Sequence, residues 1–121
     1  MISSQILQNT IDELHGITRV DFAVMDTEGN EVATTMQPDF ILPQAVVQFA
    51  DSPADSQVVQ DAHFFKIYDE KALEFILVSK GTAEDAYMLG RVAVSEIQNL
   101  ITAYKERFDK DNFIKNLILD N

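Results

Sequence analysis

The residues in this chain that could do chemistry are a few cations, histidines and aromatic side chains. Tyr87 and Arg91 are four residues apart, so a helix would place both on one face, where they could reach the same point. A guanidinium there would suit an anionic ligand such as a carboxylate. The alternative is an exposed Arg91 that pairs with Glu84 or Asp85. That arrangement is the commoner one, because arginine is seldom buried.

His63 opens an aromatic stretch and could donate a hydrogen bond to a ligand carboxylate, although a strand-end histidine more often bonds the backbone. Lys66 in the same stretch is expected to face solvent. Phenylalanines and a tyrosine could line a pocket, whereas aromatic residues at such spacing usually form core. The candidate ligand-binding residues are Phe22, Thr35, His63, Phe65, Phe75, Tyr87 and Arg91.

Motifs for catalysis, metal binding or cofactor binding do not emerge from the sequence. There is no G-x-G-x-x-G, P-loop or H-E-x-x-H pattern, and serines, histidines and acids show no hydrolase spacing. The 20 acidic residues are therefore expected to form a solvated surface. We predict no catalytic residues, no metal and no cofactor.

Composition limits the class of protein and its partners. The 121 residues correspond to one domain, and 46% hydrophobic residues suffice for one packed core. A net charge of -11 disfavours contact with nucleic acid or an anionic membrane. The absence of cysteine fits a reducing compartment. With no signal peptide and no long apolar run, the sequence predicts a cytoplasmic protein.

A β-hairpin over residues 19–35 is the clearest element. Val20, Phe22 and Val24 alternate with other residues at strand spacing, and a turn follows at residues 26–29. Asp26 can bond the backbone ahead of it, and Gly29 accepts a positive φ. The sequence therefore predicts two paired strands at this point.

Helices and further strands surround the hairpin. A first helix capped by Ser3 or Ser4 and ending at Gly16 carries Ile6, Leu7, Ile11 and Leu14. A second helix is expected over residues 40–50, with Pro43 in its first turn. Strands are expected at 57–60, 63–68 and 73–80. Both faces of the last strand are apolar, so we expect it to be covered on both sides.

A long amphipathic helix follows from residue 82 to 108, with an interruption at 109–112 and a final apolar helix. We expect residues 1–108 to form a sensor domain and 109–121 an exit helix toward a further, DNA-binding part. The terminal apolar cluster needs a second copy or a following domain, unless it folds back on its own domain. Dimer and signalling residues would be Ile97, Leu100, Ile101, Tyr104, Phe108, Phe113, Ile114, Leu117 and Ile118.

The element order predicts an α+β fold, a small antiparallel sheet with flanking helices and a long C-terminal helix. Sensor domains of the PAS and GAF type have such sheets. Scaffold domains of the roadblock and profilin type match the order at least as well. Fold alone does not choose between sensing and scaffolding.

The chain resembles the N-terminal sensor region of bacterial carbohydrate-diacid regulators and related purine-catabolism transcription factors. The resemblance lies in the first helix at 6–11, the Val-Met-Asp-x-x-Gly turn at 24–29, and the helix at 111–118. It implies a homodimeric domain of a transcriptional regulator that binds a small metabolite, such as a sugar diacid. In that family the DNA-binding element follows the sensor, so this segment itself would not contact DNA.

Two hypotheses follow, with a small enzyme as a third and weaker one. The first is a ligand-sensing, dimerising domain in which a metabolite binds between sheet and helices and shifts the long helix. The second is a non-catalytic, roadblock-like scaffold or dimerisation domain with a filled interior. The discriminating observation is whether Phe22, Phe65 and Phe75 fill the sheet face or leave a gap.

Overall fold

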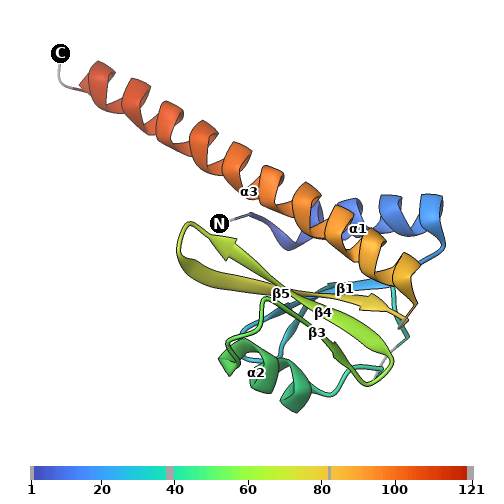
Figure 1. Ribbon diagram of the computed structural model, residues 1–121. Helices are drawn as coiled ribbons and strands as arrows, with labels where there is room; N and C mark the ends of the chain where they lie inside the picture. Colours follow the sequence, from blue (N-terminus) through green and yellow to red (C-terminus); the bar gives the residue numbers. More distant parts are fainter. Residues whose placement is uncertain (1, 38–39, 82, 120–121) are drawn as a thin grey trace.

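The structure is a computed structural model that describes residues 2–37, 40–81 and 83–119, without the side chains of residues 108–119 (Figure 1). The described residues form three helices and five strands. They are α1 (Ser4–Thr18), β1 (Phe22–Asp26), β2 (Glu31–Thr34), α2 (Pro43–Asp51), β3 (Ser56–Val59), β4 (Ala62–Asp69), β5 (Ala72–Lys80) and α3 (Glu84–Leu119).

The five strands form one sheet in the order β2-β1-β5-β4-β3, and every neighbouring pair is antiparallel. Helices α1 and α3 lie on one face of the sheet, and α2 lies on the other (Figure 1). The predicted α+β class, with an antiparallel sheet, flanking helices and a long C-terminal helix, is confirmed.

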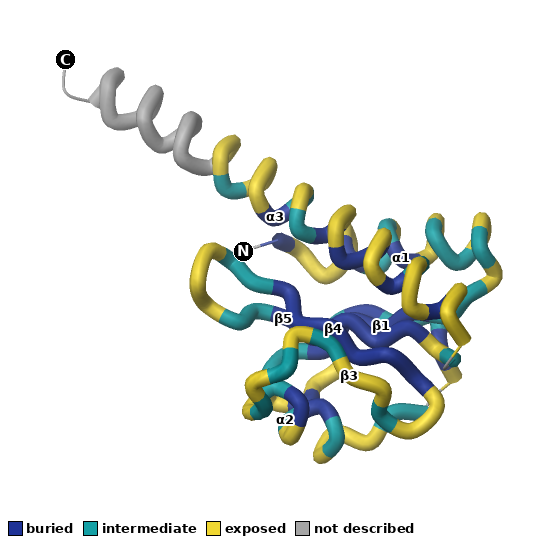
Figure 2. The backbone as a smooth tube through the Cα atoms, viewed as in Figure 1, coloured by how far each residue is buried: buried dark blue, intermediate teal, exposed yellow. Residues whose placement is uncertain are grey.

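Two apolar cores lie on opposite faces of the sheet, and alternation along β5 supplies both. Phe75 and Leu77 point into the core under α1 and α3, whereas Ile76 and Val78 point into the core under α2. Figure 2 shows the resulting buried stretch along β5, β4 and β1 between exposed outer segments. The prediction that the last strand is covered on both sides is confirmed, because side chains alternate across a strand.

The turn between β1 and β2 forms as its residues predict. The Asp26 carboxylate accepts hydrogen bonds from the backbone N–H groups of Glu28 and Asn30, at 2.9 and 2.8 Å. Gly29 has φ +87°, and a Cβ at this position would lie 2.8 Å from the carbonyl oxygen of Pro43. Glycine is therefore required both by the backbone conformation and by the approach of α2.

The helix boundaries differ from the predictions at three places. Helix α1 continues through Gly16 to Thr18, and Arg19 adopts the left-handed C-cap conformation at φ 65°. Helix α2 begins at Pro43 rather than at residue 40, because the residue before a proline avoids helical geometry and Leu42 is extended. Helix α3 runs unbroken through residues 109–112, which contain no glycine or proline. The predicted domain boundary after residue 108 therefore coincides with no break in secondary structure.

Candidate functional site

The predicted aromatic pocket is part of the core. Phe22, Phe65 and Phe75 are at most 3% exposed and pack in the same cluster as residues of α1 and α3. Their side chains fill the space between sheet and helices that a ligand pocket would need. Phe75 also lines a surface groove, which is described below.

Gly90 brings α3 close to the sheet. A Cβ on Gly90 would lie 2.3 Å from Cε2 of Phe65 and 3.1 Å from Cβ of Ser79. The Ser79 hydroxyl donates to the carbonyl oxygen of Ala86 at 2.8 Å, which fixes the same turn of the helix. The small residues around position 90 therefore serve helix–sheet packing.

His63 is buried beside the contact between α3 and the sheet. Its ring meets Tyr87 in an edge-on arrangement with centroids 5.6 Å apart, and Tyr87 lies at the same distance from Phe65. Within the described part of the chain, His63 Nε2 is buried and has no hydrogen-bond partner. The structure thus brings together three predicted site residues, His63, Phe65 and Tyr87, as a packed aromatic group.

Thr35 lies apart from this group, beside the start of β1. Its hydroxyl accepts from the backbone N–H of Phe22 at 3.0 Å and donates to the Asp21 carboxylate at 2.9 Å. These bonds hold the end of β2 against the start of β1. A structural role accounts for this residue.

Arg91 is exposed and lines an open groove of about 400 Å³ together with Tyr68, Ser95 and Gln98. Arg91 is exposed as the second prediction has it, but among the described residues no ion pair joins it to Glu84 or Asp85. Tyr87 does not line this groove. The predicted joint site of Tyr87 and Arg91 therefore stays a prediction.

Lys66 departs from its prediction, because it is buried rather than solvent-facing. Its ammonium group donates to the carbonyl oxygen of Ser52 and lies 5.3 Å from the centre of the Phe49 ring. Helix α2 and the chain that follows it cover this face of β4, and sequence spacing gave no sign of that cover. The cation therefore stabilises the end of α2.

Two glutamine side chains form hydrogen bonds with strand backbone at the edges of the sheet. The Gln8 side chain exchanges two hydrogen bonds with the backbone of Thr34 in β2, at 2.9 and 3.1 Å. The Gln98 side chain does the same with the backbone of Tyr68 in β4, at 2.9 and 2.7 Å. Sequence reasoning missed both residues, since only long-range packing brings a helical amide to a strand.

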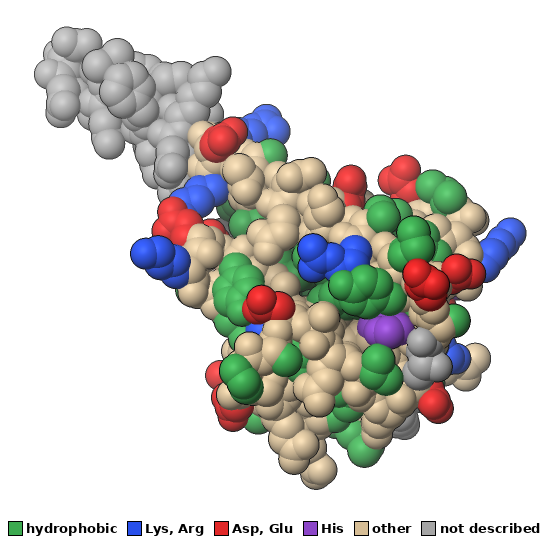
Figure 3. Space-filling model, in the orientation of Figure 1, with side chains coloured by type: hydrophobic (Ala, Val, Ile, Leu, Met, Phe, Trp, Pro, Cys, Tyr) green, Lys and Arg blue, Asp and Glu red, His purple; other side chains and the backbone are tan. Residues whose placement is uncertain are grey.

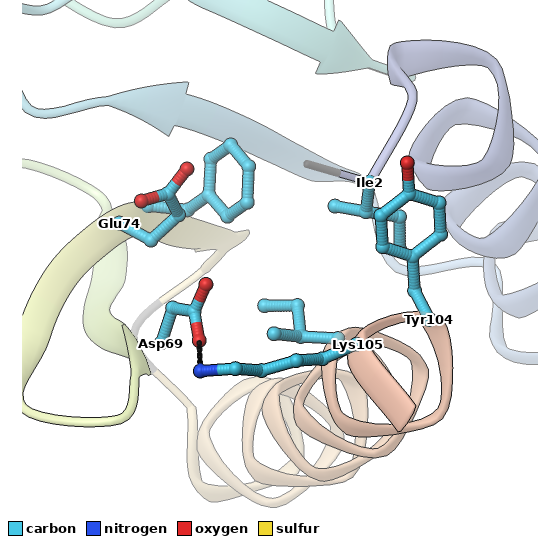
Figure 4. A pocket seen from close by; sticks show the side chains of 7 residues that line it. Ile2, Asp69, Glu74, Tyr104 and Lys105 are labelled. Atoms are coloured by element: carbon cyan, nitrogen blue, oxygen red, sulfur yellow. Dashed lines mark ion pairs between the residues drawn. The ribbon is translucent and has the colours of Figure 1, made fainter. Parts of the chain in front are cut away.

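Lys105 ties the turn between β4 and β5 to α3. Its ammonium group pairs with Asp69 at 3.7 Å (Figure 4). It also pairs with Glu70. The hydrogen bond from Lys105 lowers the pKa of Glu70, and the charge of Lys105 lowers it further. A groove of about 110 Å³ lies beside this pair, with Ile2 and Tyr104 opposite Asp69 and Glu74 (Figure 4).

The predicted dimer residues of α3 divide into two groups. Ile97 and Ile101 are buried in the domain's own core, so they are not available to a second copy in this fold. Leu100 is half-buried and Tyr104 is exposed. The side chains of Phe108, Phe113, Ile114, Leu117 and Ile118 lie outside the described part.

In the part of the chain that the structure describes, no cluster of three or more histidine, aspartate or glutamate residues could hold a metal ion. No helix there combines the length and the apolar character needed to cross a bilayer.

Comparison with known proteins found no family model that matches the chain and no match among curated proteins. The resemblance to carbohydrate-diacid regulators therefore stays a prediction from the sequence.

Proposed function

We propose that this chain is a non-catalytic scaffold domain that forms a homodimer and docks partners on its surface. The observation that carries this proposal is the filled interior, in which Phe22, Phe65 and Phe75 occupy the sheet face. A ligand between sheet and helices would have to displace these buried side chains, which costs about 3–5 kcal/mol for each phenylalanine removed from a core. The roadblock-like element order agrees with such a role.

The edge of β3 supports self-association. Side-chain amides from Gln8 and Gln98 cover backbone of β2 and of β4, whereas no described side chain covers the outer edge of β3. Its sequence, Ser-Gln-Val-Val, contains no proline and no charge, the features that usually protect an edge strand. Pairing of two β3 strands would satisfy these backbone groups in a two-fold dimer.

Light scattering of the purified chain tests this proposal. We expect the mass of a dimer, and we expect Val58→Lys to give a monomer, because two lysines would face each other near the two-fold axis. Leu42→Lys is the matched control, since Leu42 and Val58 are both 51% exposed and Leu42 lies outside β3. A monomeric wild-type chain, or a dimer that both variants preserve equally, would contradict the β3 dimer.

A second candidate, favoured by the groove beside Arg91, is the ligand-sensing domain of a bacterial transcriptional regulator. Arg91 is a cation at an open groove of about 400 Å³, a volume suited to a small dicarboxylate. Succinate and a sugar diacid would then raise the melting temperature of wild type but not of Arg91→Gln. Lys71→Gln, which removes an exposed turn cation, serves as control. If neither acid raises the melting temperature of the wild-type chain, this candidate is wrong.

A cytoplasmic location belongs to both proposals. It is consistent with a chain that has no cysteine.

A further inference from the structure

Two surface grooves lie between helices α1 and α3. One groove of about 200 Å³ lies between Ile6 of α1 and Leu100 and Tyr104 of α3. A second groove of about 170 Å³ lies between Leu14 and Ile17 of α1 and Glu96 of α3. Ile6 thus lies near Leu100 and Tyr104 while the later residue Ile17 lies near the earlier Glu96, so the two helices run antiparallel. We call this surface, lined by Ile6, Leu14, Ile17, Glu96, Leu100 and Tyr104, the α1–α3 valley.

Exposed apolar side chains continue along the α1–α3 valley. Ile17 is 74% exposed, and Ile6 and Tyr104 are each 39% exposed. Met88 and Val92, at 58% and 51% exposed, stand two turns and one turn, respectively, before Glu96 on the same row of α3. Figure 3 shows apolar side chains interspersed with charged ones on the face that α3 crosses. Large apolar side chains aligned at helical spacing are typical of a surface that receives another helix.

Charge indicates what kind of helix would fit. Glu13 and Glu96 both line the second groove, with the apolar side chains of Leu14 and Ile17 beside them. Arg107 is the cation at the opposite end, in the first groove. Residues 104–121 contain four basic and four acidic residues, so residues 1–103 carry the whole net charge of -11. A partner with lysine or arginine at the margins of its apolar face would complement this surface.

The same charges disfavour a second copy as the occupant. In a two-fold dimer each surface meets itself, so the four carboxylates of two Glu13 and two Glu96 side chains would share the interface with the two Arg107 side chains that line it. The carboxylates in excess of these cations repel one another, which disfavours the arrangement. The uncharged edge of β3, in contrast, can meet itself without this repulsion.

We infer that the α1–α3 valley docks a basic amphipathic helix of a partner protein. The apolar face of that helix would contact Ile17, Val92 and Tyr104, and its cations would pair with Glu13 and Glu96. This inference rests on the proposed scaffold function and names the partner that one of its surfaces accepts. It does not depend on which surface forms the homodimer.

The test is a titration of the full-length, ¹⁵N-labelled chain with a synthetic helical peptide, followed by NMR. The peptide has about 18 residues, so that it spans the length of α1 as a helix, with leucines on one face and lysines flanking them. We expect shift changes confined to residues 2–17 and 88–107. A peptide with glutamate in place of each lysine should bind at least about tenfold more weakly.

Matched variants distinguish docking in the α1–α3 valley from a general attraction of the basic peptide to the acidic chain. Glu13→Lys with Glu96→Lys should weaken binding at least about tenfold, whereas Glu28→Lys with Glu31→Lys, exposed on the hairpin, should have a smaller effect despite the same change in net charge. Ile17→Ser should also weaken binding, and Leu42→Ser should not. Equal effects of the two lysine pairs, or shifts scattered over the acidic surface, would overturn the inference.

The oligomeric state distinguishes this inference from the proposed function. If Ile17→Ser lowers the molar mass of the chain, the α1–α3 valley is a contact between copies and the inference is wrong. If wild type is monomeric yet binds the basic peptide in the α1–α3 valley, the homodimer fails and the docking site stands.

Discussion

At the scale of single residues, two helical glycines in this fold have different surroundings. At Gly90, the Phe65 ring occupies the place where a side chain would begin. Phe65 cannot move aside freely, because it is buried and packs against Tyr87. Gly16, the other helical glycine discussed above, has no atom within 4 Å of a Cβ placed on it.

We expect Gly90→Ala to destabilise the domain by about 1–3 kcal/mol, because the added methyl overpacks the helix–sheet contact. Gly16→Ala is the control, and it should stabilise by about 0.5–1 kcal/mol, since alanine favours a helix over glycine. Urea unfolding of both variants measures the two changes. Equal behaviour of the two variants would show that α3 does not approach the sheet this closely.

Asp26 makes the free energy of unfolding depend on pH. Its partial burial raises the pKa of the carboxyl, but hydrogen bonds from the backbone and side chain of Asn30 and the backbone of Glu28 and Gly29 lower it, and the net pKa is below the usual value of 3.8. A lowered folded-state pKa stabilises the protein above the unfolded value, and this contribution is lost as pH falls through the folded value.

We therefore expect Asp26→Asn to destabilise the fold at about pH 7 and the difference from wild type to shrink below about pH 4. Urea unfolding at several pH values measures this. Glu28→Gln removes one charge from the same turn without removing these hydrogen bonds, so it should show a smaller effect at neutral pH. If the difference in free energy of unfolding between Asp26→Asn and wild type stays constant as the pH falls, the pKa of Asp26 is not lowered by these hydrogen bonds.

At the scale of elements, the sheet is held by contacts that cross from helix to strand. Gln98 of α3 lies 30 residues from Tyr68 in sequence, yet its amide both donates to and accepts from the backbone of Tyr68. This pair fixes α3 over the part of β4 that extends past β3, which ends its pairing at Phe65. The amide also keeps this stretch of strand backbone from pairing with another chain.

We expect Gln98→Ala to cost about 1–2 kcal/mol, because two hydrogen bonds are lost and water replaces them in part. Hydrogen exchange at the Tyr68 amide should become faster in this variant. Asn99→Ala, at the neighbouring exposed position of α3, is the control and should leave that amide unchanged. Unchanged exchange in Gln98→Ala would mean that the glutamine does not hold the strand in solution.

At the scale of the whole molecule, charge is distributed unevenly. Residues 1–103 carry the entire net charge of -11, and Lys105 forms ion pairs with Asp69 and with Glu70. Self-repulsion among like charges destabilises a compact state, and salt screens it. Ion pairs would be weakened by the same screening.

We expect the melting temperature to rise between about 10 mM and 150 mM NaCl, where the Debye length falls from roughly 30 Å to 8 Å. Circular dichroism measures the melting temperature. Glu28→Lys makes the net charge less negative, so it should reduce the increase in melting temperature with salt. A fall in melting temperature would show that the ion pairs of Lys105 outweigh the repulsion.

The sequence by itself determined the local elements and the faces they bury. The β1–β2 turn follows from Asp26 and Gly29, and the two covered faces of the sheet follow from alternation along β5. These features depend on neighbouring residues in the chain, so spacing and residue type predict them. The unbroken α3 was missed because charged residues interrupt an apolar stripe without breaking a helix.

Only the tertiary structure decided what the candidate site residues do. Lys66 is buried because α2 ends above it, His63 is enclosed because α3 brings Tyr87 over it, and Gln98 reaches β4 across 30 residues of sequence. Filling of the sheet face by Phe22, Phe65 and Phe75 depends likewise on how closely two helices approach. Such contacts join segments far apart in the chain, and periodicity along one segment carries no information about its distant neighbour.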